Sequence, residues 1–316
     1  MAALPDVSVV VASVRRETRL AFLLEALAEQ TLARERFEVV VVRGRVPGAP
    51  TTTAEAYGAT VIDHEIAGPG TLRNAGAAAA RAPLVAFTDD DCRPAPDWLA
   101  RLLDAAERLD GDFILQGRTE PDPDERRRLH GLARTQRIVG PSPWFQATNI
   151  AYPRALFERL GGFDERFDGG GEDADLGLRA IAAGARAVYM GEARVWHAVH
   201  SRHVWDAVRD QGRWHTIPLV IARHPGQRRA LEWGMFWRAG HPRVLLGVAG
   251  LLAGRRSHSL AAAAAAPYIR HHLRGYDHRP AGLARAALDL PARVLVDLAG
   301  VAATARAAIR HRTAVL

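Results

Sequence analysis

The chain has 316 residues, of which 48% are hydrophobic, so it is long and apolar enough for a large folded domain and is not an intrinsically disordered protein. Its single cysteine, Cys92, excludes a disulfide framework and a zinc site built from several thiolates. The net charge of +7 arises from 42 basic residues, all of them arginines, against 35 acidic residues, and it is unevenly distributed along the chain.

Predicted strands and helices alternate in the first half of the chain. We expect strands at 7–12, 38–42, 60–63, 84–88, 112–117 and 147–152, where apolar and β-branched residues run together. We expect helices at 17–30, 70–80, 97–109 and 122–137, and a further helix that begins at Glu172. This alternation predicts an α/β fold with a mostly parallel central sheet covered on both faces.

The composition changes near residue 200. Residues 200–316 hold 18 arginines against 6 acidic residues, whereas residues 1–199 hold 24 against 29. Prolines are expected to break the second part into separate helices, at Pro218, Pro225, Pro242, Pro267, Pro280 and Pro291. We therefore predict two regions: an α/β domain over 1–199 and a basic helical region over 200–316.

The helical region raises the question of a membrane. Its apolar segment 244–254 has 11 residues, too few to span a bilayer. The helix predicted at 290–309 has an apolar face, which either packs on the first domain or lies on a membrane surface. The basic composition suits an anionic partner (a lipid headgroup, a phosphorylated acceptor or nucleic acid) or only a solvated surface. The sequence shows no signal peptide, so we expect a cytoplasmic protein, with peripheral contact to the inner face of the cell membrane as one alternative.

Three consecutive carboxylates, Asp89, Asp90 and Asp91, follow the strand predicted at 84–88. A buried strand of an open α/β sheet delivers its last residues to the carboxyl edge, where such folds bind ligands. Adjacent acids repel one another, so they persist most easily beside a cation or the complex of a cation with a diphosphate. This point is the predicted centre of the chemistry.

A second acidic cluster lies about eighty residues further along. Three glycines at 169–171 precede Glu172, Asp173 and Asp175 at the start of a predicted helix. Acids in a first helical turn are favoured by the helix dipole, but capping uses only one or two of them. Glycines that permit unusual backbone angles, together with three acids, indicate a second part of a functional site.

In their order and spacing these motifs resemble those of family 2 glycosyltransferases, over roughly residues 5–200. The matching elements are the strand and helix at 7–32, Arg73-Asn74-Ala75-Gly76, Phe87-Thr88-Asp89-Asp90-Asp91, Ala147-Thr148-Asn149-Ile150-Ala151, Gly161-Gly162-Phe163-Asp164-Glu165 and the segment 171–179. The resemblance implies the nucleotide-sugar-binding fold called GT-A. It also implies inverting transfer of a sugar to an acceptor hydroxyl on a glycan, a lipid-linked saccharide or a small molecule.

The resemblance further implies roles for individual residues. Asp89 and Asp91 would hold Mn²⁺ or Mg²⁺ against the diphosphate of a nucleoside-diphosphate sugar, with His197 as a candidate third ligand. Asp173 would be the general base that takes the proton of the acceptor hydroxyl. The remaining candidates are Glu172, Asp175 and Trp144 for support of the base or for the acceptor, and Ala12, Arg15, Arg73 and Asp90 for the nucleotide sugar. His200 and His203 are expected to follow His197 on one helical face.

Two features depart from the family pattern. The second strand ends Val41-Val42-Arg43-Gly44-Arg45, without the acidic pair that relatives carry there, so Arg43 would favour a different nucleotide. The segment Gln211-Gly212-Arg213-Trp214 is one residue short of the Gln-x-x-Arg-Trp motif of processive polysaccharide synthases. We therefore expect one sugar to be added per encounter.

Two other classes of protein remain open. A nucleotidyltransferase also uses an acidic pair and a metal, but it normally has a glycine-rich loop after the first strand, which Ser13-Val14-Arg15-Arg16-Glu17 is not. A non-catalytic protein would use the basic region to bind RNA or an anionic membrane, but it leaves both acidic clusters unexplained. For a glycosyltransferase we expect no nucleic-acid partner.

Overall fold

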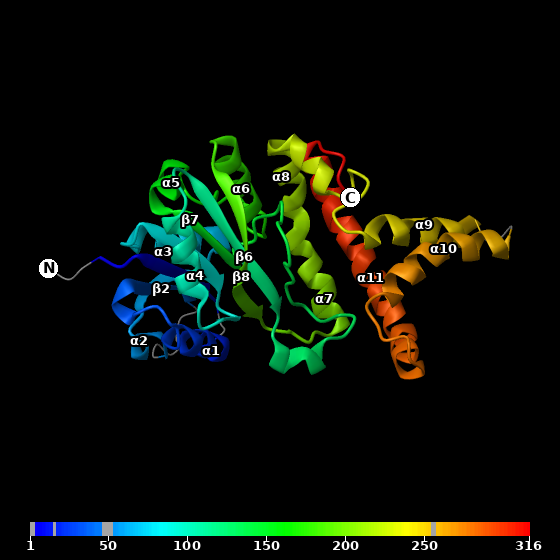
Figure 1. The fold of residues 1–316 in the computed structure, drawn as a ribbon. Coiled ribbons are helices and arrows are strands. Elements are labelled where there is room, and N and C mark those ends of the chain that lie inside the picture. The colour runs from blue at the N-terminus through cyan, green and yellow to red at the C-terminus, as the bar shows by residue number, and fades with distance from the viewer. Residues whose placement is uncertain (1–3, 15–16, 46–52, 254–256) are drawn as a thin grey trace. The chain divides into compact units, whose positions relative to one another are not determined.

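The computed structural model of the 316-residue chain describes residues 4–14, 17–45, 53–253 and 257–316 (Figure 1). The chain forms two compact units. The first unit extends to Arg127 and resumes over Thr135–Val199, and the second unit comprises Arg128–Arg134 and His200–Leu316. We predicted a boundary after residue 199. The second unit begins again at His200, but it also includes the earlier segment Arg128–Arg134.

One eight-stranded sheet runs through the first unit in the order β3-β2-β1-β4-β7-β6-β8-β5. Its strands are β1 Val7–Ser13, β2 Phe37–Arg45, β3 Thr60–Glu65, β4 Leu84–Asp89, β5 Cys92–Pro94, β6 Phe113–Pro121, β7 Asn149–Pro153 and β8 Arg186–His197. Strands β3, β2, β1 and β4 are parallel to one another, as are β6 and β8. Strands β7 and β5 run antiparallel to their neighbours. The predicted α/β class with a mostly parallel sheet is confirmed.

Helices cover both faces of this sheet, because each core strand alternates its apolar side chains between the two faces. The helices of the first unit are α1 Glu17–Ala28, α2 Thr53–Ala56, α3 Pro69–Ala79, α4 Trp98–Glu107, α5 Arg154–Arg159 and α6 Glu172–Ala182, with the 3₁₀ helices η1 Arg34–Arg36 and η2 Pro123–Arg128. Val9 and Val11 of β1 pack with α1 and α4, while Val10 packs with α3, α5 and α6. The period of two along β1 thus produces two hydrophobic layers.

The prediction of a helix at 122–137 was wrong. Only Pro123–Arg128 forms a turn of 3₁₀ helix, and the chain then makes isolated bridges through Arg134 and Ile138. The segment is charged but has no apolar stripe to bury, so tertiary partners decide its path. Arg93 holds the Asp122 carboxylate at 2.8 Å, and the Asp122 amide donates to the carbonyl of His197.

The described part of the second unit is helical. Its elements are α7 Val204–Asp210, η3 Gln211–Thr216, α8 Ile217–Arg223, η4 Pro225–Ala230, α9 Gly240–Ala253, α10 His258–Leu273 and α11 Pro280–His311. Pro218 and Pro280 stand in first turns, as predicted for helix boundaries, but Pro267 and Pro291 lie inside α10 and α11. An interior proline removes one backbone hydrogen bond, and burial of neighbours such as Tyr268 in these helices compensates for that loss.

The described helices and the histidines near residue 200 bear on two further predictions. None of the described helices combines the length and the apolar character needed to cross a membrane. We predicted that His197, His200 and His203 share one helical face. The structure shows that this prediction was wrong. His197 ends strand β8, His200 forms a bridge with Arg134, and His203 precedes the first residue of α7.

Candidate functional site

The acidic triplet lies where β4 ends and the short strand β5 begins. Asp89 is the last residue of β4, and Asp91 directly precedes Cys92, the first residue of β5. Strand β5 pairs with β8 so that Cys92 faces His197, and the Ala198 amide donates to the carbonyl of Asp91 at 2.9 Å. The long strand β8 therefore carries His197 to the acidic triplet from more than a hundred residues away.

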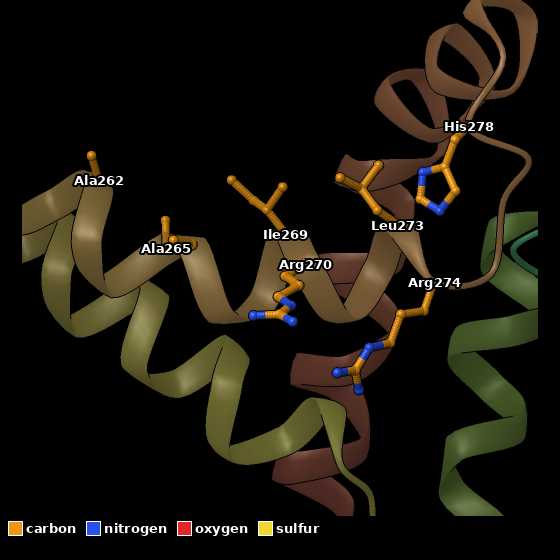
Figure 2. A pocket seen from close by; sticks show the side chains of 8 residues that line it. Ala262, Ala265, Ile269, Arg270, Leu273, Arg274 and His278 are labelled. Atoms are coloured by element: carbon orange, nitrogen blue, oxygen red, sulfur yellow. The ribbon is translucent and has the colours of Figure 1, made fainter.

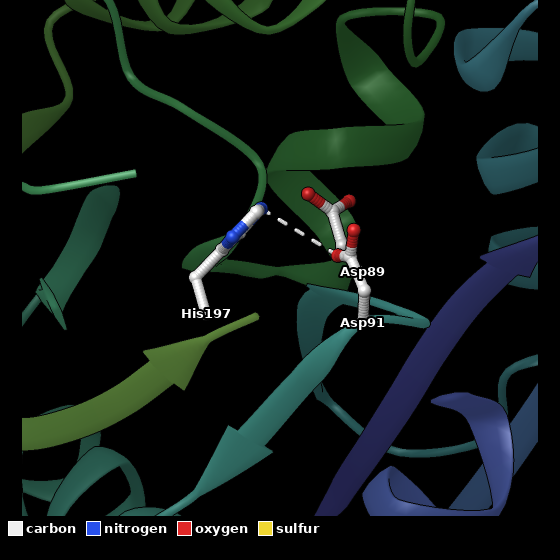
Figure 3. Close-up of side chains that lie close together, drawn as sticks. All are labelled: Asp89, Asp91 and His197. Carbon is white, nitrogen blue, oxygen red and sulfur yellow. Dashed lines mark ion pairs between the residues drawn. The ribbon is translucent and has the colours of Figure 1, made fainter. Parts of the chain in front are cut away.

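Asp89, Asp91 and His197 form a candidate metal site. Each offers one ligand atom, and these atoms all lie within 4.8 Å of one another (Figure 3). The Nε2 atom of His197 lies 3.5 Å from an Oδ1 atom of Asp91, and both side chains are almost fully buried. Two carboxylates and an imidazole that converge in this way are a fitting donor set for a divalent cation.

The second ring nitrogen of His197 fixes the orientation of the imidazole. Its Nδ1 atom lies 2.8 Å from the carbonyl oxygen of Ala198 and 3.4 Å from the Thr135 hydroxyl. Because a carbonyl only accepts, the 2.8 Å contact places a proton on Nδ1, and Nε2 is the ring nitrogen that faces Asp91. Histidine ligands of metals are commonly held by such a bond from the other nitrogen.

The middle acid faces the first strand. The Ser13 hydroxyl, at the end of β1, donates to the Asp90 carboxylate at 2.8 Å, and both residues are buried. Ala12 is the neighbour of Asp89 in the register of β1 and β4, so it lies at the same edge. Arg15 lies outside the described residues.

Arg43 lies near the end of β2 and is buried. Its guanidinium pairs with Asp63 on the adjacent strand β3 at 2.9 Å, in register. The acid that neighbours the end of β2 thus comes from β3 rather than from β2 itself.

Arg73 joins the two acidic clusters. From α3 it donates through Nη2 to Asp89 and through Nη1 to Glu172, each at 2.7 Å, and its guanidinium lies 5.7 Å from the centre of the Phe163 ring. Only 6% of the residue is exposed. Burial by itself lowers the pKa of Arg73, but the carboxylates of Asp89, Glu172 and Asp173 outweigh it and raise the pKa above its ordinary value.

Helix α6 presents Asp173 beside this arginine. Gly170 and Gly171 adopt φ angles of 152° and 93°, which a residue with a side chain rarely adopts, and they turn the chain into the helix. The Asp173 carboxylate accepts from the amides of Ala174 at 2.8 Å and Ala147 at 3.3 Å. Loss of hydration and then the negative charge of Glu172 raise the pKa of Asp173 to about 7, while Arg73 opposes the shift.

The other predicted acceptor residues take different positions. Asp175 is buried and pairs with Arg179 at 2.8 Å, and the Arg179 guanidinium also donates to the carbonyl of Gly162. Trp144 is half-buried on the loop that leads to Ala147, and its amide lies 3.3 Å from the Ser142 hydroxyl. Next to Trp144, the buried ring of Phe145 packs directly against Gly177 of α6.

Asn149 is a core residue of the site region. The Trp98 indole donates to its Oδ1 atom at 2.9 Å, and its Nδ2 atom donates to the carbonyls of Arg118 and Ala193, each at 2.9 Å. It thereby ties α4, β6 and β8 together where β6 shifts register between Gly117 and Arg118. The side chain is fully satisfied and buried, which explains a polar residue at the start of β7.

Three residues with contacts to the site were not singled out by sequence reasoning. Thr148 donates to the second carboxylate oxygen of Asp89 at 3.0 Å, Ser13 bonds Asp90, and Thr135 contacts His197. Ser13 and Thr148 could have been found from the sequence, because each is a polar residue at one end of an apolar strand. Thr135 gave no such signal, because its position depends on the path of an irregular segment.

Comparison with known proteins agrees with this geometry. Residues 8–163 match the family model described as glycosyl transferase family 2. The chain belongs to glycosyltransferase family 2. This match favours the glycosyltransferase interpretation over the nucleotidyltransferase and the non-catalytic binding protein that the sequence left open.

Validoxylamine A glucosyltransferase of Streptomyces hygroscopicus subsp. limoneus is 31% identical over 245 residues, which are 63% of this chain and 52% of that protein. The chain thus spans about half the length of this relative. A solved mannosyltransferase of Pyrobaculum calidifontis, in complex with GDP-Man and Mn²⁺, matches with a TM-score of 0.58 at 20% identity and covers 98% of this chain and 88% of its own. TarS of S. aureus (residues 1–349), in complex with UDP-GlcNAc, matches with a TM-score of 0.51 at 18% identity, over 98% of this chain and 92% of its own. These two likenesses confirm the GT-A fold.

Proposed function

We propose that this family 2 member transfers one sugar per encounter from a nucleoside-diphosphate sugar to an acceptor hydroxyl, with inversion at the sugar carbon. The observation that carries the proposal is the convergence of Asp89, Asp91 and His197 at one sheet edge, joined by Arg73 to the helix start that holds Asp173. The nucleotide sugars in the two solved relatives support this class of donor.

Asp89, Asp91 and His197 would hold a divalent cation, which when bound offsets the negative charge that develops on the departing nucleoside diphosphate. Mg²⁺ prefers oxygen ligands and nearly regular octahedral geometry, whereas an imidazole beside two carboxylates is better suited to Mn²⁺. The Mn²⁺ in the mannosyltransferase structure supports the same ion. We therefore expect Mn²⁺ to support a higher rate than Mg²⁺.

Asp173 would take the proton of the acceptor hydroxyl as that oxygen attacks the anomeric carbon from the side opposite the leaving group. A carboxylate with a pKa of about 7 is largely deprotonated just above neutral pH and is still basic enough to accept the proton. General-base help of this kind contributes about 10²–10⁴ in rate. Because the acceptor attacks directly, no glycosyl-enzyme intermediate forms and the configuration inverts.

The remaining candidates divide between donor and acceptor. Arg73, Asp90 and Ala12 would lie on the donor side, where β1 and β4 end and on α3. Arg15, also predicted for the nucleotide sugar, is outside the described residues. Glu172, which precedes Asp173, and Trp144, on the loop whose Ala147 amide donates to Asp173, would lie on the acceptor side, with Asp175 in support through α6. The acceptor is a glycan, a lipid-linked saccharide or a small molecule, and the name of the Streptomyces glucosyltransferase supports the last of these.

Thermal-shift measurements test the proposal. We expect nucleoside diphosphates and their sugars to raise the Tm only in the presence of Mn²⁺, since a ligand of the folded state alone stabilises it by mass action. Asp91→Asn should abolish the Mn²⁺-dependent part of the shift. Asp173→Asn should keep that shift but lose at least about 10² in turnover of the donor. Glu158→Gln, an exposed control on α5 that pairs with Arg154, should behave as wild type. An unchanged Mn²⁺-dependent shift in Asp91→Asn would disprove the cation site.

A further inference from the structure

One face of helix α10 carries apolar side chains at the spacing of a buried helix surface but is open to solvent. Ala262, Ala265, Ala266, Ile269 and Leu273 repeat at intervals of three and four residues, the pattern that normally faces a core. They line a hollow of about 580 Å³, and Figure 2 shows Ala262, Ile269 and Leu273 on the same side of the helix. Ile269 is 41% exposed.

The other side of α10 already has its packing partners. A Cβ atom at Gly250 of α9 would lie 2.2 Å from the Cβ atom of Ala264, so small residues let α9 and α10 approach closely. Tyr268 donates to Asp297 of α11 at 2.9 Å, and His272 contacts the carbonyl of Ala286 in the same helix. Contacts with two helices of the second unit, α9 and α11, therefore fix the outward orientation of the open apolar face.

The helices also end in exposed leucines. Leu251 and Leu252 close α9 with 65% and 74% of their surface exposed, and Leu260, near the start of α10, is 63% exposed. Within the second unit, α9 and α10 lie side by side and extend away from α11 (Figure 1). Exposed leucines at the end of a projecting helix pair are typical of a surface that contacts a partner or a membrane.

The charge around this face has one sign. Arg270, Arg274 and His278 line the hollow together with the apolar residues. Neither arginine forms an ion pair with any residue in the described part of the chain, and the sequence contains no Asp or Glu from residue 233 to residue 276. Unpaired arginines beside an apolar helix face match an amphiphilic surface with anionic headgroups.

We propose that α9 and α10 dock this protein on an anionic lipid bilayer. The headgroup phosphates contact Arg270 and Arg274, while the apolar face of α10 and the leucines at the end of the helix pair enter the interface between headgroups and acyl chains. A second copy of the chain is a poorer occupant, because pairing two such faces brings arginines against arginines. Nucleic acid would engage the arginines but leave the apolar face without a role.

Flotation of the full chain with vesicles tests this proposal. We expect binding to vesicles that contain phosphatidylglycerol and little binding to vesicles of phosphatidylcholine alone. Arg270→Gln with Arg274→Gln should weaken binding about 30-fold, since each arginine near an anionic surface contributes about a factor of five. Leu251→Ser with Leu252→Ser should weaken it about tenfold or more.

Matched changes elsewhere in the second unit serve as controls. Arg306→Gln with Arg310→Gln removes the same charge from α11, and Ile309→Ser removes an apolar residue there that is more exposed than either leucine. The vesicle binding of these controls should stay near wild type. All variants should keep the wild-type Tm and the Mn²⁺-dependent Tm shift with nucleotide sugars. These measurements distinguish failure of docking from failure of catalysis. The proposal is overturned if both α9–α10 variants bind like their controls, or if an RNA oligonucleotide binds more tightly than vesicles and only the arginine variant reduces it.

Discussion

Arg73 on α3 and Glu172 at the start of α6 form a buried ion pair of 2.7 Å between residues 99 positions apart in the sequence. The same guanidinium contacts Asp89, so one side chain connects the candidate cation site with the helix that carries the candidate base. Changes at this arginine therefore affect both halves of the site, and changes at Glu172 reach Asp173 through charge.

Arg73→Gln should destabilise the fold by about 3–5 kcal/mol, because it leaves the buried carboxylate of Glu172 without its cation. Denaturant unfolding followed by tryptophan fluorescence measures this change. Arg166→Gln, which breaks an exposed pair with Asp164, is the matched control and should cost no more than about 1 kcal/mol. Equal costs for the two variants would contradict the central role assigned to Arg73.

Glu172→Gln should move the acidic limb of the pH–rate profile to lower pH. The proposed base, Asp173, accepts a proton only when it is deprotonated, so kcat/KM should fall as the pH drops below its pKa of about 7. The negative charge of Glu172 is one cause of that raised pKa, and its removal lowers the pKa. The profile should be measured at saturating Mn²⁺, with Glu165→Gln as a control whose midpoint stays in place. A midpoint that moves upward, or not at all, is the contrary result.

Asn149→Ala should cost about 3 kcal/mol or more of stability, because it removes the partners of the Trp98 indole and of two buried carbonyls. The neighbouring change Thr148→Val removes only the bond to Asp89 and should cost about 1 kcal/mol while it weakens Mn²⁺ binding. Unfolding curves and a Mn²⁺ titration separate the two effects. If Asn149→Ala weakens Mn²⁺ binding without loss of stability, its assignment to the core is wrong.

Gly177→Ala should disturb the loop that carries Trp144. A Cβ atom at Gly177 would lie 2.2 Å from the Phe145 ring, which must then move, at a cost of about 1–3 kcal/mol. We expect the KM for the acceptor to rise more than the KM for the donor, because Trp144 adjoins the displaced residue. Gly140→Ala meets no atom within 4 Å and is the control, with steady-state kinetics as the measurement.

The sequence alone determined the α/β class and most of the first unit. Continuous apolar runs predicted β1 and β4, which end at Ser13 and Asp89, and helical spacing predicted α1, α3 and α4 to within a few residues. These elements are strongly patterned and locally consistent, so the pattern is sufficient to predict them. The motifs around Asp89 and Glu172 also indicated the family before any geometry was known.

Only the tertiary structure decided which side chains meet. The placement of His197 follows from the register of β5 and β8, and the position of Arg73 between Asp89 and Glu172 follows from the packing of α3 and α6. Asp175 shows what the sequence could not predict. Its position in the acidic motif suggested a role in the site, but in the structure its carboxylate pairs with Arg179. Patterns along the chain report which face of an element is buried, but long-range pairing and register depend on the sum of many weak contacts between distant segments.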